Sequence, residues 1–145
     1  MLKILVIGLG YVGTANAVLL SQNNQVTCFD IDLSKSNKLI KGISPFKDRD
    51  LSEYLSSKKL NLKSAESFPL KNDNFDFAII ATPTNYNAQT NKFDTSSIEQ
   101  SLKNIYKSSS SPTVIIRSTI PVGYVKKIKK DFPNLEIIFV PEFLR

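Results

Sequence analysis

The sequence predicts an α/β fold: a doubly wound, mostly parallel sheet with helices on both of its faces. Two observations lead to this prediction. Short apolar runs rich in valine and isoleucine recur along the chain, as buried parallel strands do. Amphipathic stretches separate these runs, and such alternation is typical of a sheet covered by helices on both sides. The apolar runs are residues 2–7, 26–29, 77–81, 114–116 and 137–140.

The helices between these strands are predicted from apolar side chains at helical spacing and from the residues that start or stop a helix. Asn23 and Asn24 end the first helix, and Gly42 ends the second. Pro121 opens the last one. The predicted helices cover residues 11–21, 33–41, a segment that begins at Asp50, a segment from 94 to 106, and 122–130, with a short additional strand at 60–62.

One domain is expected, spanning residues 1–145, because a chain of this length with 41% hydrophobic residues builds one core and is short for two. The single Cys28 excludes an internal disulfide. The apolar runs are far shorter than the roughly 20 residues that a membrane span needs, and no charged-then-apolar leader opens the chain. We therefore expect a cytoplasmic protein without a membrane partner.

The charge balance is basic, with 19 Lys and Arg against 13 Asp and Glu and a formal net charge of +6. Such a balance suits a nucleic acid, an acidic surface or a phosphate-bearing small ligand. The only basic cluster is 126–130, which we interpret as a solvated helix face because no aromatic residues interleave it. We expect no nucleic-acid partner. The absence of histidine excludes a Ser-His-Asp triad and a histidine metal site, and no metal is expected.

A glycine-rich sequence follows the first apolar run directly. Gly8, Gly10 and Gly13 form a G-x-G-x-x-G pattern around Tyr11 and Val12. The first glycine permits a tight turn, the second lets the backbone approach a pyrophosphate, and the third lets the helix pack close to the strand. The phosphates then meet the helix N-terminus. In this context the pattern predicts a dinucleotide site on a Rossmann-like sheet, the alternative being an ordinary strand-to-helix turn.

An acidic residue is expected about 20 residues further on, at the end of the second strand. Asp30 occupies that position. It would accept hydrogen bonds from both hydroxyls of an adenosine ribose and would repel a 2′-phosphate, so NAD is favoured over NADP. Asp32 is the alternative, as a surface acid or a helix cap. Lys35 either reaches the adenosine end of the cofactor or is an ordinary exposed lysine.

Polar residues also follow the later apolar runs, where the carboxyl edge of a parallel sheet binds ligands. Thr82 and Thr84 offer hydroxyls to phosphate or ribose, or merely satisfy the turn backbone, and Pro83 stiffens their loop. We expect this loop and the two later ones to converge on one crevice. The later loops contain Ser118 and Thr119, and then Glu142, Phe143, Leu144 and Arg145.

Taken together, these segments resemble the UDP-glucose/GDP-mannose dehydrogenase family nearly from end to end. Each segment is modest alone, but their order and spacing are highly specific. Arg117 stands where relatives often have lysine, which preserves the charge. The matching segments are residues 8–13, 42–46 with Asp48, 81–86, 93–97, 118–123 and 141–145.

The resemblance implies oxidation of the C6 alcohol of a UDP-hexose to a carboxylate, in two hydride transfers to two NAD molecules. It also implies that Thr119 helps to order a catalytic water and that residues 142–145 begin a substrate-contacting loop. The residues assigned to the cofactor are Gly8, Gly10, Tyr11, Val12, Gly13, Asp30, Lys35, Thr82, Pro83, Thr84, Ser118 and Thr119, and those assigned to the UDP-sugar are Glu142, Phe143, Leu144 and Arg145.

UDP-glucose is the favoured substrate, because residues 85–97 look more like that branch of the family. The alternatives are GDP-mannose, an N-acetylated UDP-hexosamine, or a non-catalytic NAD-binding module. In this family a further glutamate follows the 141–145 run, and a later half supplies the lysine, asparagine, cysteine and aspartate of catalysis. Cys28 is expected in the core. We therefore expect these 145 residues to bind NAD as a monomer without turnover, and the full-length parent to be a homodimer.

Overall fold

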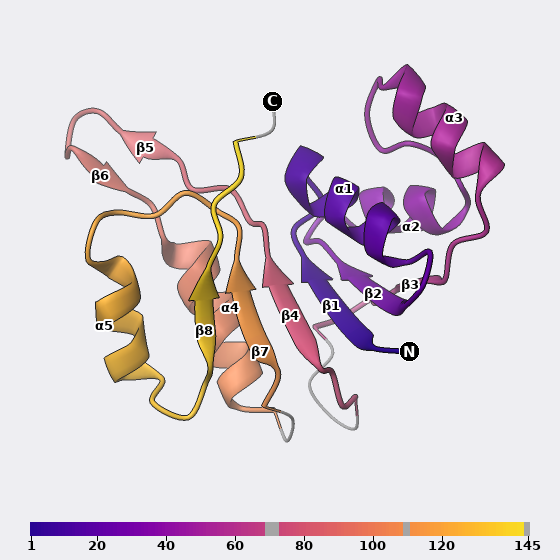
Figure 1. The fold of residues 1–145 in the computed structure, drawn as a ribbon. Helices are drawn as coiled ribbons and strands as arrows, with labels where there is room; N and C mark the ends of the chain where they lie inside the picture. The colour runs from indigo at the N-terminus through magenta and orange to yellow at the C-terminus, as the bar shows by residue number, and fades with distance from the viewer. Residues whose placement is uncertain (69–72, 109–110, 144–145) are drawn as a thin grey trace.

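The computed structural model describes residues 1–68, 73–108 and 111–143. Six strands form one parallel sheet in the order β3-β2-β1-β4-β7-β8 (Figure 1). The predicted doubly wound sheet is thereby confirmed, and every strand pair in it is parallel. Its strands are β1 (Lys3–Ile7), β2 (Gln25–Phe29), β3 (Leu62–Ser64), β4 (Phe77–Ile80), β7 (Thr113–Ile116) and β8 (Ile137–Phe139).

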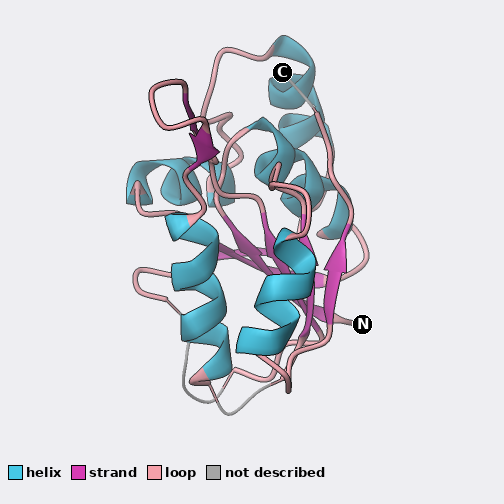
Figure 2. Ribbon diagram, turned by 90° about the vertical axis from the view of Figure 1, so that its left-hand side faces the viewer, coloured by secondary structure: helices cyan, strands magenta, loops and turns pink. Residues whose placement is uncertain are grey.

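Five helices cover the two faces of this sheet, because the side chains of each strand alternate between them. In β1, Ile4 and Val6 join a buried cluster with α1, α2 and α3, whereas Leu5 and Ile7 join a second cluster with α4 and α5. Figure 2 shows α4 and α5 in front of the strands. The helices are α1 (Tyr11–Leu20), α2 (Leu33–Ile40), α3 (Arg49–Ser57), α4 (Ser96–Tyr106) and α5 (Tyr124–Asp131).

The strand order reverses direction beside β1, which lies between β2 and β4. The chain runs outward from β1 to β3 and then returns to β4 and continues to β8. Loops that leave the carboxyl ends of β1 and β4 therefore diverge to opposite faces of the sheet, and the crevice between them is where ligands bind in folds of this kind. We therefore expect a ligand-binding site at the carboxyl ends of β1 and β4.

The last helix starts later than its sequence suggests. It was predicted to begin at Val122, but α5 begins at Tyr124. Gly123 has a φ of +81°, a left-handed conformation that is not helical, and Val122 is fully exposed. Pro121 therefore opens a turn, in which the Tyr124 N–H donates to the Pro121 carbonyl at 3.2 Å, and the helix follows it.

The four lysines of the basic cluster lie on the outer face of α5, opposite the buried Tyr124 and Ile128. All four are exposed, and Lys127 forms an ion pair with Glu99 of α4 at 3.5 Å. This is the solvated helix face that the sequence indicates.

Two further details differ from prediction. β3 lies two residues beyond the predicted strand at 60–62, and pairs with β2 through Val26 and Leu62. A small antiparallel hairpin of β5 (Tyr86–Asn87) and β6 (Lys92–Phe93) was not predicted at all. Its turn places Asn91 at a φ of 52°, and the rings of Tyr86 and Phe93 pack edge to face at 5.2 Å. In Figure 1 this hairpin projects beyond the carboxyl edge of the sheet.

Within the described ranges, no helix is long and apolar enough to cross a membrane. The same part of the chain holds no group of three His, Cys, Asp or Glu side chains that could bind a metal ion.

Candidate functional site

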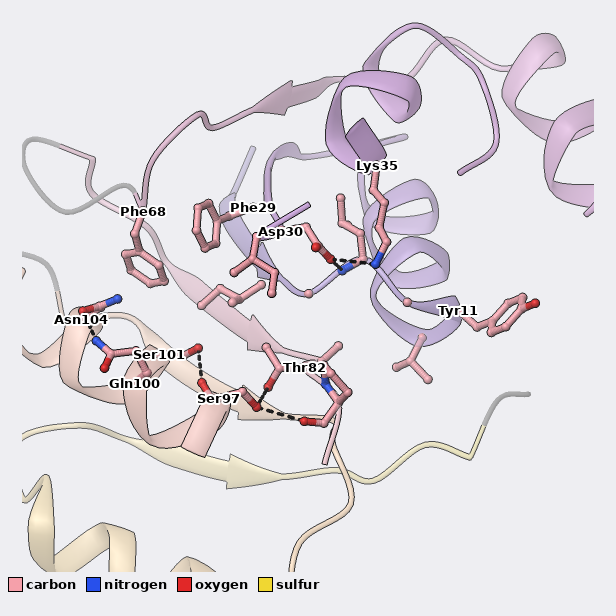
Figure 3. Close-up of a pocket in the computed structure, with 18 residues that line it drawn as sticks. Tyr11, Phe29, Asp30, Lys35, Phe68, Thr82, Ser97, Gln100, Ser101 and Asn104 are labelled. Carbon is pink, nitrogen blue, oxygen red and sulfur yellow. Dashed lines mark hydrogen bonds and ion pairs between the residues drawn. The ribbon is translucent and has the colours of Figure 1, made fainter. Parts of the chain in front are cut away.

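A cavity of about 480 Å³ opens at the carboxyl edge of the sheet, where β1 lies between β2 and β4 (Figure 3). Its size falls in the range of about 300–1,000 Å³ that is typical of small-molecule sites. The walls come from residues 7–12, from residues 29–31 with Lys35, from residues 81–83, and from α4. Segments far apart in the sequence thus form one site.

The glycine loop closes one wall, and two of its glycines are required by the packing. Gly8 has a φ of +88°, and a Cβ built on it would lie 2.7 Å from the carbonyl oxygen of Ala81. A Cβ on Gly13 would lie 1.8 Å from the carbonyl oxygen of Gly8. The close approach predicted for Gly13 therefore exists, and its partner is the preceding loop backbone.

Gly10 has a different environment, because no heavy atom lies within 4 Å of a Cβ built on it. It is the N-cap of α1 and supplies no side chain to that helix end. The first N–H groups of a helix have no acceptor within the helix and attract anions. At Gly10 they are left accessible from the cavity, which is the arrangement that a pyrophosphate requires.

Asp30 lies at the cavity wall and is only 6% exposed. Its Oδ2 accepts a hydrogen bond from the Leu9 N–H at 2.6 Å, and its Oδ1 accepts one from the Asp32 N–H at 2.9 Å. The ammonium group of Lys35 lies 3.7 Å from Oδ2 and also lines the cavity. The carboxylate is therefore fixed in place beside the glycine loop.

Asp32, the alternative to Asp30, lies on the surface and does not line the cavity. It is the N-cap of α2, where its carboxylate accepts a hydrogen bond from the Ser34 N–H at 3.1 Å. Hydrogen bonds from Ser34, helped by the charges of Lys35 and Lys38, hold the pKa of Asp32 below its ordinary value of 3.8. Asp30 therefore lines the cavity, whereas Asp32 caps α2 on the surface.

We predict that Asp32→Ala lowers the melting temperature slightly and leaves the affinity for NAD within about twofold of wild type. Because the folded-state pKa lies below 3.8, the contribution of the charged cap is complete above that pH and is lost as the pH falls through the folded-state pKa. Thermal melts of both proteins across this range should therefore converge at acidic pH. A loss of NAD affinity as large as that of Asp30→Ala would contradict the division of roles.

The loop after β4 provides the opposite wall through Thr82 and Pro83. Ser97, at the start of α4, donates from its hydroxyl to the Thr82 Oγ1 at 2.9 Å and to the Pro83 carbonyl at 3.0 Å. Ser118 is buried and donates to the Thr82 carbonyl at 2.6 Å. Ser118 therefore anchors the loop and does not line the cavity.

Thr84 and Thr119 come together although neither lines the cavity, and their hydroxyl oxygens are 2.8 Å apart. Beyond them, Glu142 forms an ion pair with Arg117 and accepts a hydrogen bond from the Asn16 amide at 3.3 Å. The loops after β4, β7 and β8 are thus linked along one edge. Phe143 is 74% exposed, and Leu144 and Arg145 lie outside the described residues.

Sequence reasoning missed one wall of the cavity. Four polar residues of α4 line it: Ser97, Gln100, Ser101 and Asn104. Each of them lies three or four residues from at least two of the others, so they share one face of the helix. That spacing is present in the sequence, but the apolar residues of the same helix predict only that it packs against the core.

The comparison with known sequences decides the family. Residues 2–145 match the NAD binding domain of the UDP-glucose/GDP-mannose dehydrogenase family. The chain belongs to this family. Over 99% of its length it is 44% identical to the UDP-glucose 6-dehydrogenase of Campylobacter jejuni and 42% identical to that of Streptococcus pneumoniae. It spans 37% and 36% of the length of these relatives.

Solved structures give the same answer for the fold. The UDP-D-ManNAc dehydrogenase of Pyrococcus horikoshii superposes with a TM-score of 0.79 at 25% identity, over 99% of this chain and 37% of that one. The UDP-N-acetyl-mannosamine dehydrogenase of Staphylococcus aureus has a TM-score of 0.76 at 26% identity, with the same coverage. The Rossmann-like fold and NAD as the cofactor, both predicted from the sequence, are confirmed.

Proposed function

We propose that the cavity is the NAD site of a UDP-glucose 6-dehydrogenase, which oxidises the C6 alcohol of UDP-glucose to the carboxylate of UDP-glucuronate with two NAD. The observation that carries this proposal is that the glycine loop and Asp30 line the same cavity. Identities of 44% and 42% to UDP-glucose 6-dehydrogenases support UDP-glucose as the substrate.

Each part of the cavity suits one part of NAD. The open N-terminus of α1 at Gly10 receives the pyrophosphate, with Tyr11 and Val12 beside it. Asp30 accepts hydrogen bonds from the hydroxyls of the adenosine ribose, and its charge repels a 2′-phosphate. Lys35, whose ammonium group lies 3.7 Å from that carboxylate and lines the cavity, reaches the adenosine end of the cofactor. When bound, NAD supplies the acceptor for the hydride that leaves the sugar carbon.

The linked loops beyond the cavity are the proposed place of the substrate. Thr119, whose hydroxyl is oriented by Thr84, orders a catalytic water. Glu142 begins the segment that contacts the UDP-sugar, followed by Phe143, Leu144 and Arg145. The ion pair with Arg117 fixes the Glu142 carboxylate at the end of β7. These residues would position the substrate and the water.

We further propose that these 145 residues bind NAD without turnover, as a monomer in the cytoplasm, and that the full-length parent is a homodimer. The covalent step implied by the family requires a thiolate. Cys28 does not provide one, because it is fully buried in β2 and its burial raises the pKa of the thiol to about 12. Light scattering of the purified chain measures its molar mass in solution and so tests whether it is a monomer.

The Cys28 thiol should resist alkylation while the protein is folded. At about pH 8, iodoacetamide is expected to leave the native chain unmodified and to label the urea-unfolded chain, because only a thiolate with solvent access reacts. Intact-mass spectrometry counts the added groups. Rapid labelling of the native chain would show that this cysteine is accessible and would remove the argument against its acting as a nucleophile.

Two assays test the proposed function. First, the chain mixed with NAD and UDP-glucose should produce no NADH, and NADH formation above the no-sugar control would contradict the absence of turnover. Second, the chain should replace the corresponding 37% of the Campylobacter jejuni relative in a chimera that forms NADH from UDP-glucose. A folded chimera that binds UDP-glucose but not NAD would contradict the proposal. The matched control is the same chimera with Asp30→Ala.

A further inference from the structure

One end of the cavity is lined by two amide side chains that the function described so far does not use. Gln100 and Asn104 project from successive turns of α4 (Figure 3). The Gln100 Nε2 donates a hydrogen bond to the Asn104 Oδ1 at 3.0 Å. The two amides therefore form one connected polar unit in the wall of the site.

This pairing leaves two hydrogen-bonding groups available side by side. Within the described part of the chain, no protein group is hydrogen-bonded to the Gln100 Oε1 or to the Asn104 Nδ2. The first is an acceptor and the second is a donor. Rotating both amides exchanges the two groups but still leaves one acceptor and one donor. In either orientation, the two amides therefore present one hydrogen-bond acceptor beside one donor.

Two aromatic side chains also line the cavity, and Gln100 itself is exposed. The rings of Phe29 and Phe68 pack edge to face with centroids 5.2 Å apart, and both line the cavity. In Figure 3, Phe68 and Asn104 are drawn at one end of the cavity, Tyr11 at the other end, and Asp30 between them. A planar ring bound at the Phe68 end would have flat apolar walls and one polar edge to meet.

The position of Asp30 identifies that ring. In the proposed binding mode Asp30 accepts hydrogen bonds from the adenosine ribose, and the N-terminus of α1 binds the pyrophosphate. Because the ribose connects the pyrophosphate to the base, the base must lie on the far side of Asp30 from the glycine loop. That side is the end lined by Phe68, Gln100 and Asn104. Adenine carries an amino donor next to a ring-nitrogen acceptor, the pattern that asparagine and glutamine amides recognise with two hydrogen bonds.

We propose that Gln100 and Asn104 form an adenine-reading pair, so that this cavity selects the base of the dinucleotide as well as its ribose. The proposal rests on the proposed function, since it takes NAD as the ligand. The Gln100 carbonyl accepts from the amino group of adenine, and the Asn104 amide donates to the adjacent ring nitrogen. A base without amino hydrogens loses the first bond and leaves an acceptor facing an acceptor.

The test is a calorimetric titration with NAD and with nicotinamide etheno-adenine dinucleotide, in which an etheno bridge between the amino nitrogen and N1 removes both amino hydrogens and leaves N7 as an acceptor. The wild-type chain is expected to bind NAD at least about tenfold more tightly, a difference of about 1.4 kcal/mol. Gln100→Leu should weaken NAD binding by about this factor and bring the ratio of the two affinities close to one. Asn104→Leu should weaken the binding of both dinucleotides by a similar factor, because N7 is an acceptor in both bases. Lys103→Leu, on the same helix but outside the cavity lining, should leave the ratio unchanged.

The outcomes separate this inference from the function on which it rests. An unchanged ratio in Gln100→Leu would show that the etheno group is excluded by its size, and would overturn the inference, as would equal affinities in the wild type. Both leucine variants should keep the preference for NAD over NADP, because Asp30 is intact, and this shows that their site is folded. If the wild type binds neither dinucleotide, the proposed function fails and the inference fails with it.

Discussion

Gly13→Ala is expected to abolish NAD binding and to lower the free energy of unfolding by about 3 kcal/mol or more. Overpacking normally costs about 1–3 kcal/mol, because neighbouring side chains move aside. Here the added methyl group would lie 1.8 Å from the carbonyl oxygen of Gly8, a backbone atom in a loop that is itself packed against Ala81. No side-chain rotation relieves that contact, so the loop between β1 and α1 must change its path.

Gly10→Ala is the matched control, because its methyl group meets no protein atom within 4 Å. The free energy of unfolding should fall by less than about 1 kcal/mol, the usual difference between glycine and alanine at an N-cap. Affinity for NAD should nevertheless fall about tenfold or more, because the methyl group occupies the space where the pyrophosphate approaches α1. Urea unfolding and calorimetry measure the two effects separately. Normal NAD affinity in Gly10→Ala would contradict this placement of the pyrophosphate.

Asp30→Ala is expected to lose about tenfold or more in NAD affinity together with about 1–3 kcal/mol of stability. The affinity falls because the ribose hydroxyls lose their acceptor. The stability falls because the Leu9 N–H, now paired with the Asp30 Oδ2 at 2.6 Å, would remain buried without a partner. Lys35 would also lose the carboxylate 3.7 Å from its ammonium group.

Asp30→Asn separates these two effects. The asparagine oxygen still accepts from the Leu9 N–H, so most of the stability should return. The negative charge does not return, so NADP should be discriminated against less strongly than in the wild type. Unfolding curves and titrations with both cofactors measure the outcome. If Asp30→Asn kept the full preference for NAD over NADP, the charge of Asp30 would not be the cause of that preference.

The sequence was sufficient wherever one strong physical constraint acted on consecutive residues. The buried strands show as apolar runs because both of their faces are covered, and the strand-to-helix turn shows as Gly8 and Gly13 because no other residue fits there. Asp30 was predictable because its role depends on its distance from the glycines along the chain. The same logic failed for β3, whose three residues are too few to show a pattern.

The remaining features depend on contacts between distant segments. The hairpin of β5 and β6 has two residues in each strand, too few for alternation, and its turn relies on the unusual conformation of Asn91. The start of α5 was misplaced because proline is common in the first turn of a helix, whereas here Gly123 adopts a left-handed conformation. The α4 wall of the cavity could not be assigned without knowing which face of that helix turns toward Asp30.

The proposed function requires that the cavity beside Gly10 and Asp30 binds NAD. The most direct test is a calorimetric titration of the 145-residue chain with NAD and, in parallel, with NADP. We expect saturable one-to-one binding of NAD and affinity for NADP at least about tenfold lower, because the 2′-phosphate meets the Asp30 carboxylate. Absence of NAD binding by the folded chain, or equal affinity for the two cofactors, would contradict it.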